Sequence, residues 1–101
     1  MEYNHLLDLA ANEDDPLRRL AIVAIYSITL LTCVETNTTK PFNPLLGETF
    51  ELVTPDFRFL AEQVSHHPPI TGVHCEGNSG YTLYTNNLVK NKFTGKCLQL
   101  N

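Results

Sequence analysis

The stretch EQVSHHPPI, residues 62–70, constrains the fold of this chain more than any other. In it, two adjacent histidines precede two adjacent prolines. Pro68 and Pro69 lack a backbone N–H and fix φ, so they cannot continue a helix or a central strand. His67 precedes a proline, which favours an extended backbone. We therefore expect a strand that stops abruptly and holds the imidazoles of His66 and His67 on a stiff end.

Such a corner suits an anionic group. Imidazole titrates near pH ~6.5, and a nearby phosphate favours its protonated form, which donates hydrogen bonds from both nitrogens. Neighbouring side chains on a strand point to opposite faces, but this constraint relaxes at a strand end. The two imidazoles are therefore candidates for binding one phosphate group.

A second stiff stretch, KPFNPLLGE, occupies residues 40–48. Pro41 and Pro44 fix two positions, and Lys40 and Asn43 each precede a proline, so the backbone is expected to be extended. Lysine is a compact charge suited to phosphate, and an asparagine amide both donates and accepts. From the residues alone, a rigid helix-to-strand connector with a solvated lysine is the favoured explanation of this stretch, because stiff proline connectors are common.

Together the two stretches closely resemble the signatures of the oxysterol-binding protein family of lipid-transfer proteins, in the same order and at similar spacing. The resemblance covers essentially the whole chain, but only the early part of the family's lipid-binding domain. It implies an incomplete antiparallel β-barrel with a helical layer near its start, which encloses a tunnel for one lipid. The expected partners are a sterol or other lipid, phosphatidylinositol 4-phosphate and membrane surfaces.

The resemblance also implies residue roles. The histidine pair of the family grips the inositol phosphate at the tunnel mouth, a role carried over to His66 and His67. The lysine of the proline-rich motif contributes to the same phosphate site, so Lys40 is included, and Asn43 follows as a head-group residue. The resemblance implies no enzymatic activity and no cofactor, and it implies a cytoplasmic protein acting peripherally at membrane contact sites.

Hydrophobic periodicity predicts two helices ahead of the proline-rich stretch. The first runs from Met1 to Ala11, and the second from Pro16 to about Val34. Asp15 followed by Pro16 is a helix start signal, a capping carboxylate before proline at the first position. The second helix is apolar nearly all round, so we expect it to be buried on several faces.

After Gly47 the period becomes alternating, which predicts short strands joined by turns. The expected strands are Thr49–Val53, Phe57–Val64, Ile70–Glu76, Tyr81–Asn86, Leu88–Phe93 and Lys96–Leu100. Turn residues separate them, including Asn86-Asn87. The prediction is an α+β, mainly β chain, an antiparallel meander following N-terminal helices. We divide it into a helical layer (1–35), a proline-rich connector (36–47) and strands (48–101) of one partial lipid-binding domain.

Composition excludes several classes of partner. The net charge is −4 and the pI near 5.4, which argues against nucleic acid and against bulk attraction to anionic membranes. Cys33, Cys75 and Cys97 show neither paired nor metal-like spacing, and the first residues do not have the pattern of a signal peptide, so reduced thiols in the cytosol are expected.

Three rival interpretations fit these residues less well. A metal site would draw on His66, His67, His74 and Cys75, but these come as adjacent pairs, whose side chains diverge on a strand. Nucleophilic catalysis would need Ser65 and His66 on one face, whereas strand neighbours face opposite ways. A membrane-spanning helix would need about 20 apolar residues, and 20–34 falls short. His5 and His74 are assigned to structural roles.

Three functional hypotheses follow. The first is non-enzymatic lipid transfer, with the head-group phosphate held by His66, His67 and Lys40. The second is a phosphoinositide sensor or scaffold at membrane contact sites that binds without moving cargo. The third is a fragment of a longer lipid-transfer protein, because about eight strands are needed for a closed barrel with a usable interior, and the family's lid, later strands and C-terminal basic segment have no counterpart here.

Overall fold

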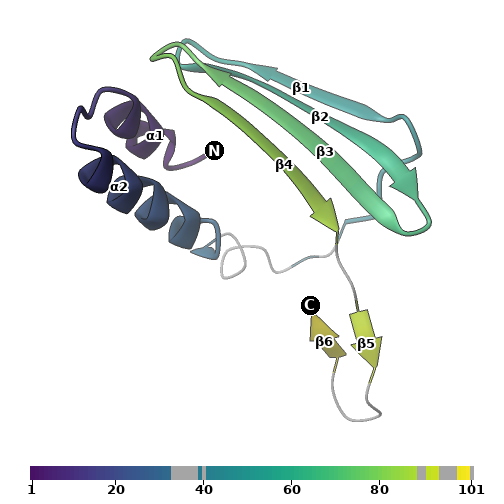
Figure 1. Ribbon diagram of the computed structural model, residues 1–101. Coiled ribbons are helices and arrows are strands. Elements are labelled where there is room, and N and C mark those ends of the chain that lie inside the picture. The colour runs from purple at the N-terminus through teal and green to yellow at the C-terminus, as the bar shows by residue number, and fades with distance from the viewer. Residues whose placement is uncertain (33–38, 40, 89–90, 94–97, 101) are drawn as a thin grey trace.

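The computed structural model describes residues 1–32, 39, 41–88, 91–93 and 98–100. Two helices, α1 (Asn4–Ala11) and α2 (Pro16–Thr29), precede four antiparallel strands that pair in chain order (Figure 1). The strands are β1 (Thr49–Val53), β2 (Phe57–His66), β3 (Pro69–Gly77) and β4 (Thr82–Leu88). A separate two-stranded sheet follows, made of β5 (Asn91–Phe93) and β6 (Leu98–Leu100). The predicted α+β class, with helices followed by an antiparallel meander, is confirmed.

The start of α2 is the predicted one. The carboxylate of Asp15 accepts a hydrogen bond from the backbone N–H of Leu17 at 2.9 Å, and Pro16 occupies the first helical turn. Proline has no N–H to leave unsatisfied at this position, and the capping carboxylate binds one of the free N–H groups at the helix start.

The end of α2 differs from the prediction, because the helix ends at Thr29 and not near Val34. The hydroxyl of Thr29 donates to the carbonyl of Tyr26 at 2.6 Å, and the hydroxyl of Thr32 donates to the carbonyl of Thr29 at 2.6 Å. Side-chain hydroxyls thus compete for the carbonyls that would continue the helix. Val34 itself lies outside the described residues.

The expected burial of α2 is wrong for this chain. Tyr26 is the buried residue of the helix, while Leu20 and Ile28 are each 65% exposed. An apolar helix face needs a protein surface to cover it, and the part of the chain that the structure describes covers only the Tyr26 side.

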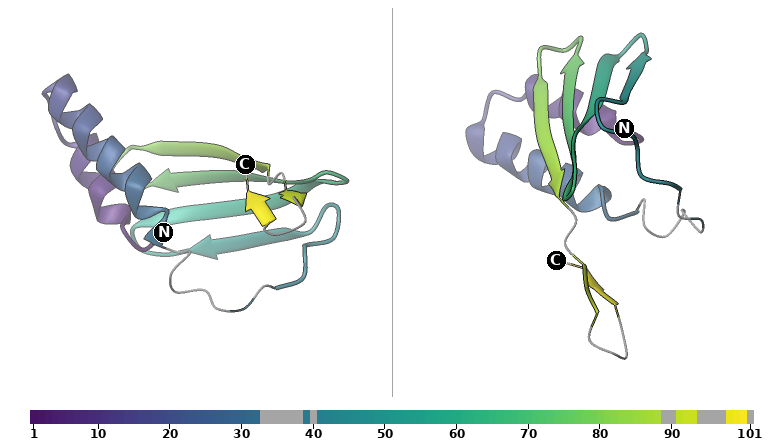
Figure 2. Two further views of the ribbon diagram at one scale, coloured as in Figure 1. Left: turned by 90° about the horizontal axis from the view of Figure 1, so that it is seen from below. Right: turned by 90° about the vertical axis from the view of Figure 1, so that its right-hand side faces the viewer.

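The helix pair lies against one face of the sheet, at the end where β3 turns into β4 (Figures 1 and 2). The hydroxyl of Ser79, in that turn, donates to the carboxylate of Asp8 on α1 at 2.6 Å. The buried apolar side chains of the described residues gather between these layers and are Leu7, Ala10, Tyr26, Phe57 and Cys75. The core is therefore small and lies at one end of the sheet.

One predicted turn is wrong, because Asn86 and Asn87 lie inside β4. They pair with Gly72 and Thr71 of β3 in an unbroken register. Asparagine is a poor strand former, but cross-strand pairing along the whole of β3 outweighs that local preference. The strand predicted over Leu88–Phe93 is correspondingly divided between the end of β4 and β5.

Candidate functional site

The histidine–proline stretch forms a sharp corner between β2 and β3. His66 is the last residue of β2, His67 and Pro68 form the turn with a cis peptide bond between them, and Pro69 opens β3 opposite His66. The predicted abrupt stop is present, but β2 runs two residues beyond the expected end at Val64, and β3 begins one residue before the expected start at Ile70. The prolines lie in the turn and at a strand start, positions that do not require their missing N–H.

A β-bulge just before the corner sets the direction of His66. The pairing register moves from Gln63 opposite Thr71 to Ser65 opposite Ile70, so β2 carries one extra residue there. A bulge changes the face to which the following side chains belong. By register, His66 shares a face with Gln63, the face that the helices cover, and Ser65 lies on the other face.

The two imidazoles lie close together at this corner. Their ring centroids are 4.5 Å apart at an interplanar angle of 61°. His66 is half-buried and His67 is exposed. Nδ1 of His66 is buried and has no hydrogen-bond partner among the described residues. A buried ring nitrogen without a partner costs free energy, so this corner has an unused hydrogen-bonding group.

The proline-rich stretch ends in a tight turn. The N–H of Glu48 donates to the carbonyl of Leu45 at 3.0 Å, and Gly47 has a φ of 78°. A positive φ at the third position defines a type II turn and favours glycine. The carboxylate of Glu48 also accepts from the N–H of Leu45 at 2.8 Å, which closes the turn from its other side.

Gln63 joins the two signature stretches. Its carbonyl accepts from the N–H of Gly47 at 2.8 Å, and its N–H donates to the carbonyl of Glu48 at 3.0 Å. Its side chain is only 2% exposed and accepts from the hydroxyl of Thr71 at 2.6 Å. The proline-rich stretch is thereby fixed to β2 at the residue that precedes the bulge and the histidine corner.

The structure brings together some of the predicted site residues and not others. His66 and His67 come together as expected. Asn43 is exposed and belongs to the segment fixed by Gln63, and no contact joins it to the imidazoles among the described interactions. Lys40 lies outside the described residues. Sequence reasoning missed the connecting role of Gln63 and Thr71, although the glutamine lies inside the first signature.

His74 lies away from this corner, on the face opposite the helices. Its Nε2 is 2.9 Å from the carboxylate of Glu76, and its ring lies 4.8 Å from that of Tyr84. These contacts satisfy the side chain locally. Among the described residues, no group of three or more histidine, cysteine, aspartate or glutamate side chains is arranged to hold a metal ion.

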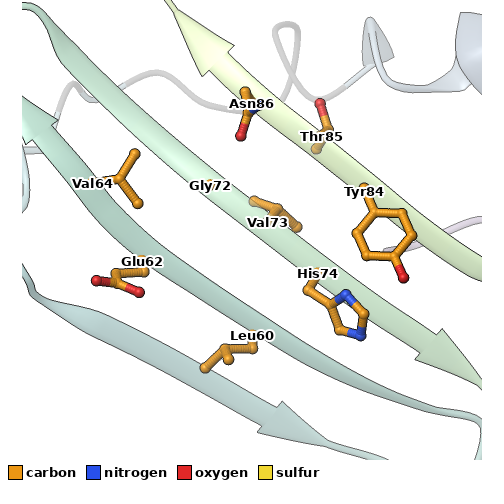
Figure 3. Close-up of a pocket in the computed structure, with 9 residues that line it drawn as sticks. All are labelled: Leu60, Glu62, Val64, Gly72, Val73, His74, Tyr84, Thr85 and Asn86. Carbon is orange, nitrogen blue, oxygen red and sulfur yellow. The ribbon is translucent and has the colours of Figure 1, made fainter.

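The described residues form a large hollow on each face of the sheet. One, of about 530 Å³, lies between the helices and the sheet face that they cover. Its lining is mostly apolar and consists of Met1, Leu7, Val23, Tyr26, Ser27, Leu30, Phe59, Val73, Leu83, Tyr84, Thr85 and Asn87. The other, of about 640 Å³, is a shallow depression over Gly72 on the opposite face, between Glu62, Val64 and Leu60 on one side and Tyr84 and Asn86 on the other (Figure 3).

The segments that the structure describes include no helix long and apolar enough to cross a membrane.

The fold and the two signatures define a class, that of the lipid-binding domains of oxysterol-binding proteins. The oxysterol-binding protein family model matches residues 1–101, and the chain belongs to this family. Human oxysterol-binding protein-related protein 6 is 44% identical over 99% of this chain and 11% of its own length. Human oxysterol-binding protein-related protein 2 is 43% identical over 98% of this chain and 21% of its own length.

Solved structures of similar domains support the same family assignment. The Osh1 ORD domain in complex with ergosterol is 41% identical, with a TM-score of 0.87 over 96% of this chain and 23% of that chain. The Osh3 ORD of Saccharomyces cerevisiae in complex with PI(4)P is 35% identical, with a TM-score of 0.84 over 99% of this chain and 27% of that chain. This chain thus spans about a quarter of these solved domains, and its fold is the corresponding part of an incomplete β-barrel.

Proposed function

We propose that this chain forms the first part of a lipid-binding domain that carries lipid between membranes, and that its histidine corner binds a phosphoinositide head group. The observation that carries the proposal is the junction at Gln63, which holds the two family signatures side by side. Similar domains have been solved with sterols and with PI(4)P, which supports a lipid as the ligand here.

The chemistry of the corner suits a phosphate. His66 and His67 present neighbouring imidazoles, and the buried Nδ1 of His66 has no partner among the described residues. We propose that both rings donate to phosphate oxygens, and that Lys40 contributes a charge-assisted hydrogen bond. Asn43 completes the head-group site through its amide, which donates and accepts.

The apolar hollow between the helices and the sheet would form one wall of a lipid chamber. Phe59, Val73 and Leu83 line it from the sheet, and Val23 and Leu30 line it from α2. A sterol or acyl chain gains about 25 cal/mol for each Å² of apolar surface removed from water. A sheet of four strands covers only part of such a ligand, so extraction of a whole lipid would need the remainder of a barrel.

A phosphoinositide sensor is the second candidate function, and the open chamber favours it for this chain taken alone. Recognition of a head group requires only the corner, whereas transfer requires enclosure of the lipid chains. Either activity is non-covalent binding without a chemical step, and either would place the protein in the cytoplasm, peripherally at membrane contact sites.

Ligand-dependent melting of the chain tests the proposal. A short-chain, water-soluble phosphatidylinositol 4-phosphate should raise the melting temperature, because a ligand that binds only the folded state stabilises it. The double variant His66→Ala/His67→Ala should abolish the rise. The matched control His5→Ala/His74→Ala should retain it, because neither residue lies at the corner. An equal rise for both double variants would exclude the histidine corner as the head-group site.

Two further measurements refine the result. Binding should be stronger at mildly acidic than at mildly alkaline pH, because only protonated imidazole donates from both nitrogens. An affinity that is unchanged over that range would count against a protonated pair. Lipid movement between two vesicle populations then separates transfer from sensing, since a sensor binds without moving cargo.

A further inference from the structure

The proline-rich stretch carries an exposed apolar surface. Phe42 is 101% exposed, Leu45 is 72% exposed and Leu46 is 67% exposed. Large apolar side chains at such exposure in one short segment are a mark of an interaction surface. We name Phe42, Leu45 and Leu46 the apolar tip. No residue from Pro41 to Leu46 is charged, so insertion of this segment into an apolar medium requires no ion to be desolvated.

The apolar tip is held by a stiff backbone. Pro41 and Pro44 flank Asn43 and Phe42 and fix φ on both sides. Beyond them, the type II turn and the backbone bonds between Gly47 and Gln63 fix the end of the segment to β2. A preorganised segment loses little conformational entropy when it binds, so its apolar surface contributes more of its transfer free energy to association.

The apolar tip lies at the same end of the molecule as the histidine corner. Figures 1 and 2 show the segment that leads into β1 at the end of the sheet where β2 turns into β3. Pro44 lines a small hollow of about 60 Å³ together with Gln63 and Thr71, which are close to the corner in the β2–β3 register. A surface that contacts the apolar tip is therefore brought to the imidazoles.

We propose that the apolar tip inserts into a lipid surface and holds the histidine corner at the depth of the lipid head groups. The inference rests on the proposed function, because a head-group site at a membrane needs a docking element beside it. The net charge of −4 opposes attraction to anionic lipid, so docking by apolar insertion suits this chain better than docking by charge. Phenylalanine is suited to the boundary between head groups and acyl chains.

The sequence contains no tryptophan, so a single introduced tryptophan reports its own environment. Phe42→Trp should show a blue-shifted emission with neutral phosphatidylcholine vesicles and quenching by brominated acyl chains. Leu17→Trp is the matched control, because Leu17 on α2 is similarly exposed at 76% and lies outside the apolar tip. Unchanged emission from Trp at position 42, or equal quenching at both positions, would overturn the proposal.

A second pair of variants tests the apolar tip as the docking element. Phe42→Ser/Leu46→Ser should weaken partition into phosphatidylcholine vesicles about tenfold or more, since each lost side chain removes substantial apolar burial. Leu17→Ser/Leu20→Ser removes two similarly exposed leucines from α2 and should leave partition into these vesicles unchanged. If it weakens partition as much as Phe42→Ser/Leu46→Ser does, the apolar tip is not the docking element. Circular dichroism spectra matching the parent chain show that each variant is folded.

Discussion

Tyr81 lies in the connection between β3 and β4, where it contacts the end of β3. Its ring lies so close to Gly77 that a Cβ added there would overlap it, and its carbonyl accepts from the N–H of Gly77 at 2.9 Å. Burial, assisted by the neighbouring Cys75, raises the pKa of Tyr81 to about 12. Burial likewise raises the pKa of the Cys75 thiol. These groups therefore stay protonated in the folded chain well into the alkaline range.

This shift predicts how stability depends on pH. A raised pKa means that the folded state holds the phenol proton more tightly than the unfolded chain, whose tyrosines titrate near pH ~10. The contribution of Tyr81 is full below pH ~10 and is lost as the pH rises to about 12. Urea unfolding across that range should show a falling free energy of unfolding, and Tyr81→Phe should make the fall shallower.

The exposed Tyr84 provides the control for this prediction. Tyr84→Phe should leave the slope of stability against pH as it is in the parent chain, because Tyr84 is 71% exposed. Tyr81→Phe should keep part of the slope, since the buried Cys75 titrates in the same direction. Identical slopes for the parent chain and Tyr81→Phe would show that Tyr81 does not cause the alkaline loss.

At the scale of single residues, the sequence predicted the structure correctly where the restrictions come from neighbouring residues. Adjacent histidines before adjacent prolines predicted the corner because backbone restrictions act within a residue or two. The role of Gln63 was beyond such reasoning, because its partners Gly47, Glu48 and Thr71 are set by strand register. Whether Lys40 and Asn43 reach a phosphate stays a prediction.

At the scale of elements, the turn over residues 45–48 connects the proline-rich stretch to the sheet. Gly47 has a φ of 78° and open space where a Cβ would stand. Gly47→Ala should therefore destabilise the chain through backbone strain, by about 1–2 kcal/mol. It should also weaken binding at the histidine corner, because the turn holds the two signatures together. Chemical denaturation and ligand-dependent melting measure the two effects.

Gly72 offers a matched alanine control for the turn. It lies in the middle of β3, and an added Cβ would make only ordinary contacts, 3.5 Å from Val64 and 3.6 Å from Asn86. Gly72→Ala should then be neutral or mildly stabilising, since alanine lowers the entropy of the unfolded chain. If both alanine variants lose the same stability, the positive φ of Gly47 is not the cause.

Elements were predicted best where a local signal sets a boundary. Thr49–Val53 matches β1, and the Asp15–Pro16 start matches that of α2. The errors arose where non-local strand pairing or competing hydrogen bonds determine the boundary of an element. Asn86 and Asn87 are residues that favour turns, but pairing with β3 places them in a strand. In α2, the hydroxyl of Thr29 bonds to a main-chain carbonyl, and the helix ends earlier than predicted.

At the scale of the whole molecule, a large apolar surface lies open. Leu20 and Ile28 on α2 are each 65% exposed, and this face has no cover among the described residues. The isolated chain should therefore self-associate and bind a hydrophobic dye. Leu20→Gln/Ile28→Gln should reduce both without loss of helicity, because glutamine is a good helix former. Sedimentation velocity and dye fluorescence measure the outcome.

A variant of a buried leucine serves as the control, because it shows the effect of disrupting the core instead of the exposed surface. Leu7 is 6% exposed, so Leu7→Gln should unfold the chain and increase dye binding. Self-association that is unchanged in the Leu20→Gln/Ile28→Gln variant would show that other surfaces drive it. The sequence predicted an apolar helix that requires cover, but it did not show that the covered face would be the one that carries Tyr26.

The order of the strands in the sheet has a consequence for synthesis. Strands β1 to β4 pair strictly in chain order. Each strand after β1 can therefore pair with the preceding strand once it has left the ribosome. Sheets built from such local pairings form quickly, because little loop-closure entropy opposes each step. In a nascent polypeptide, the histidine corner would be complete once β3 has emerged.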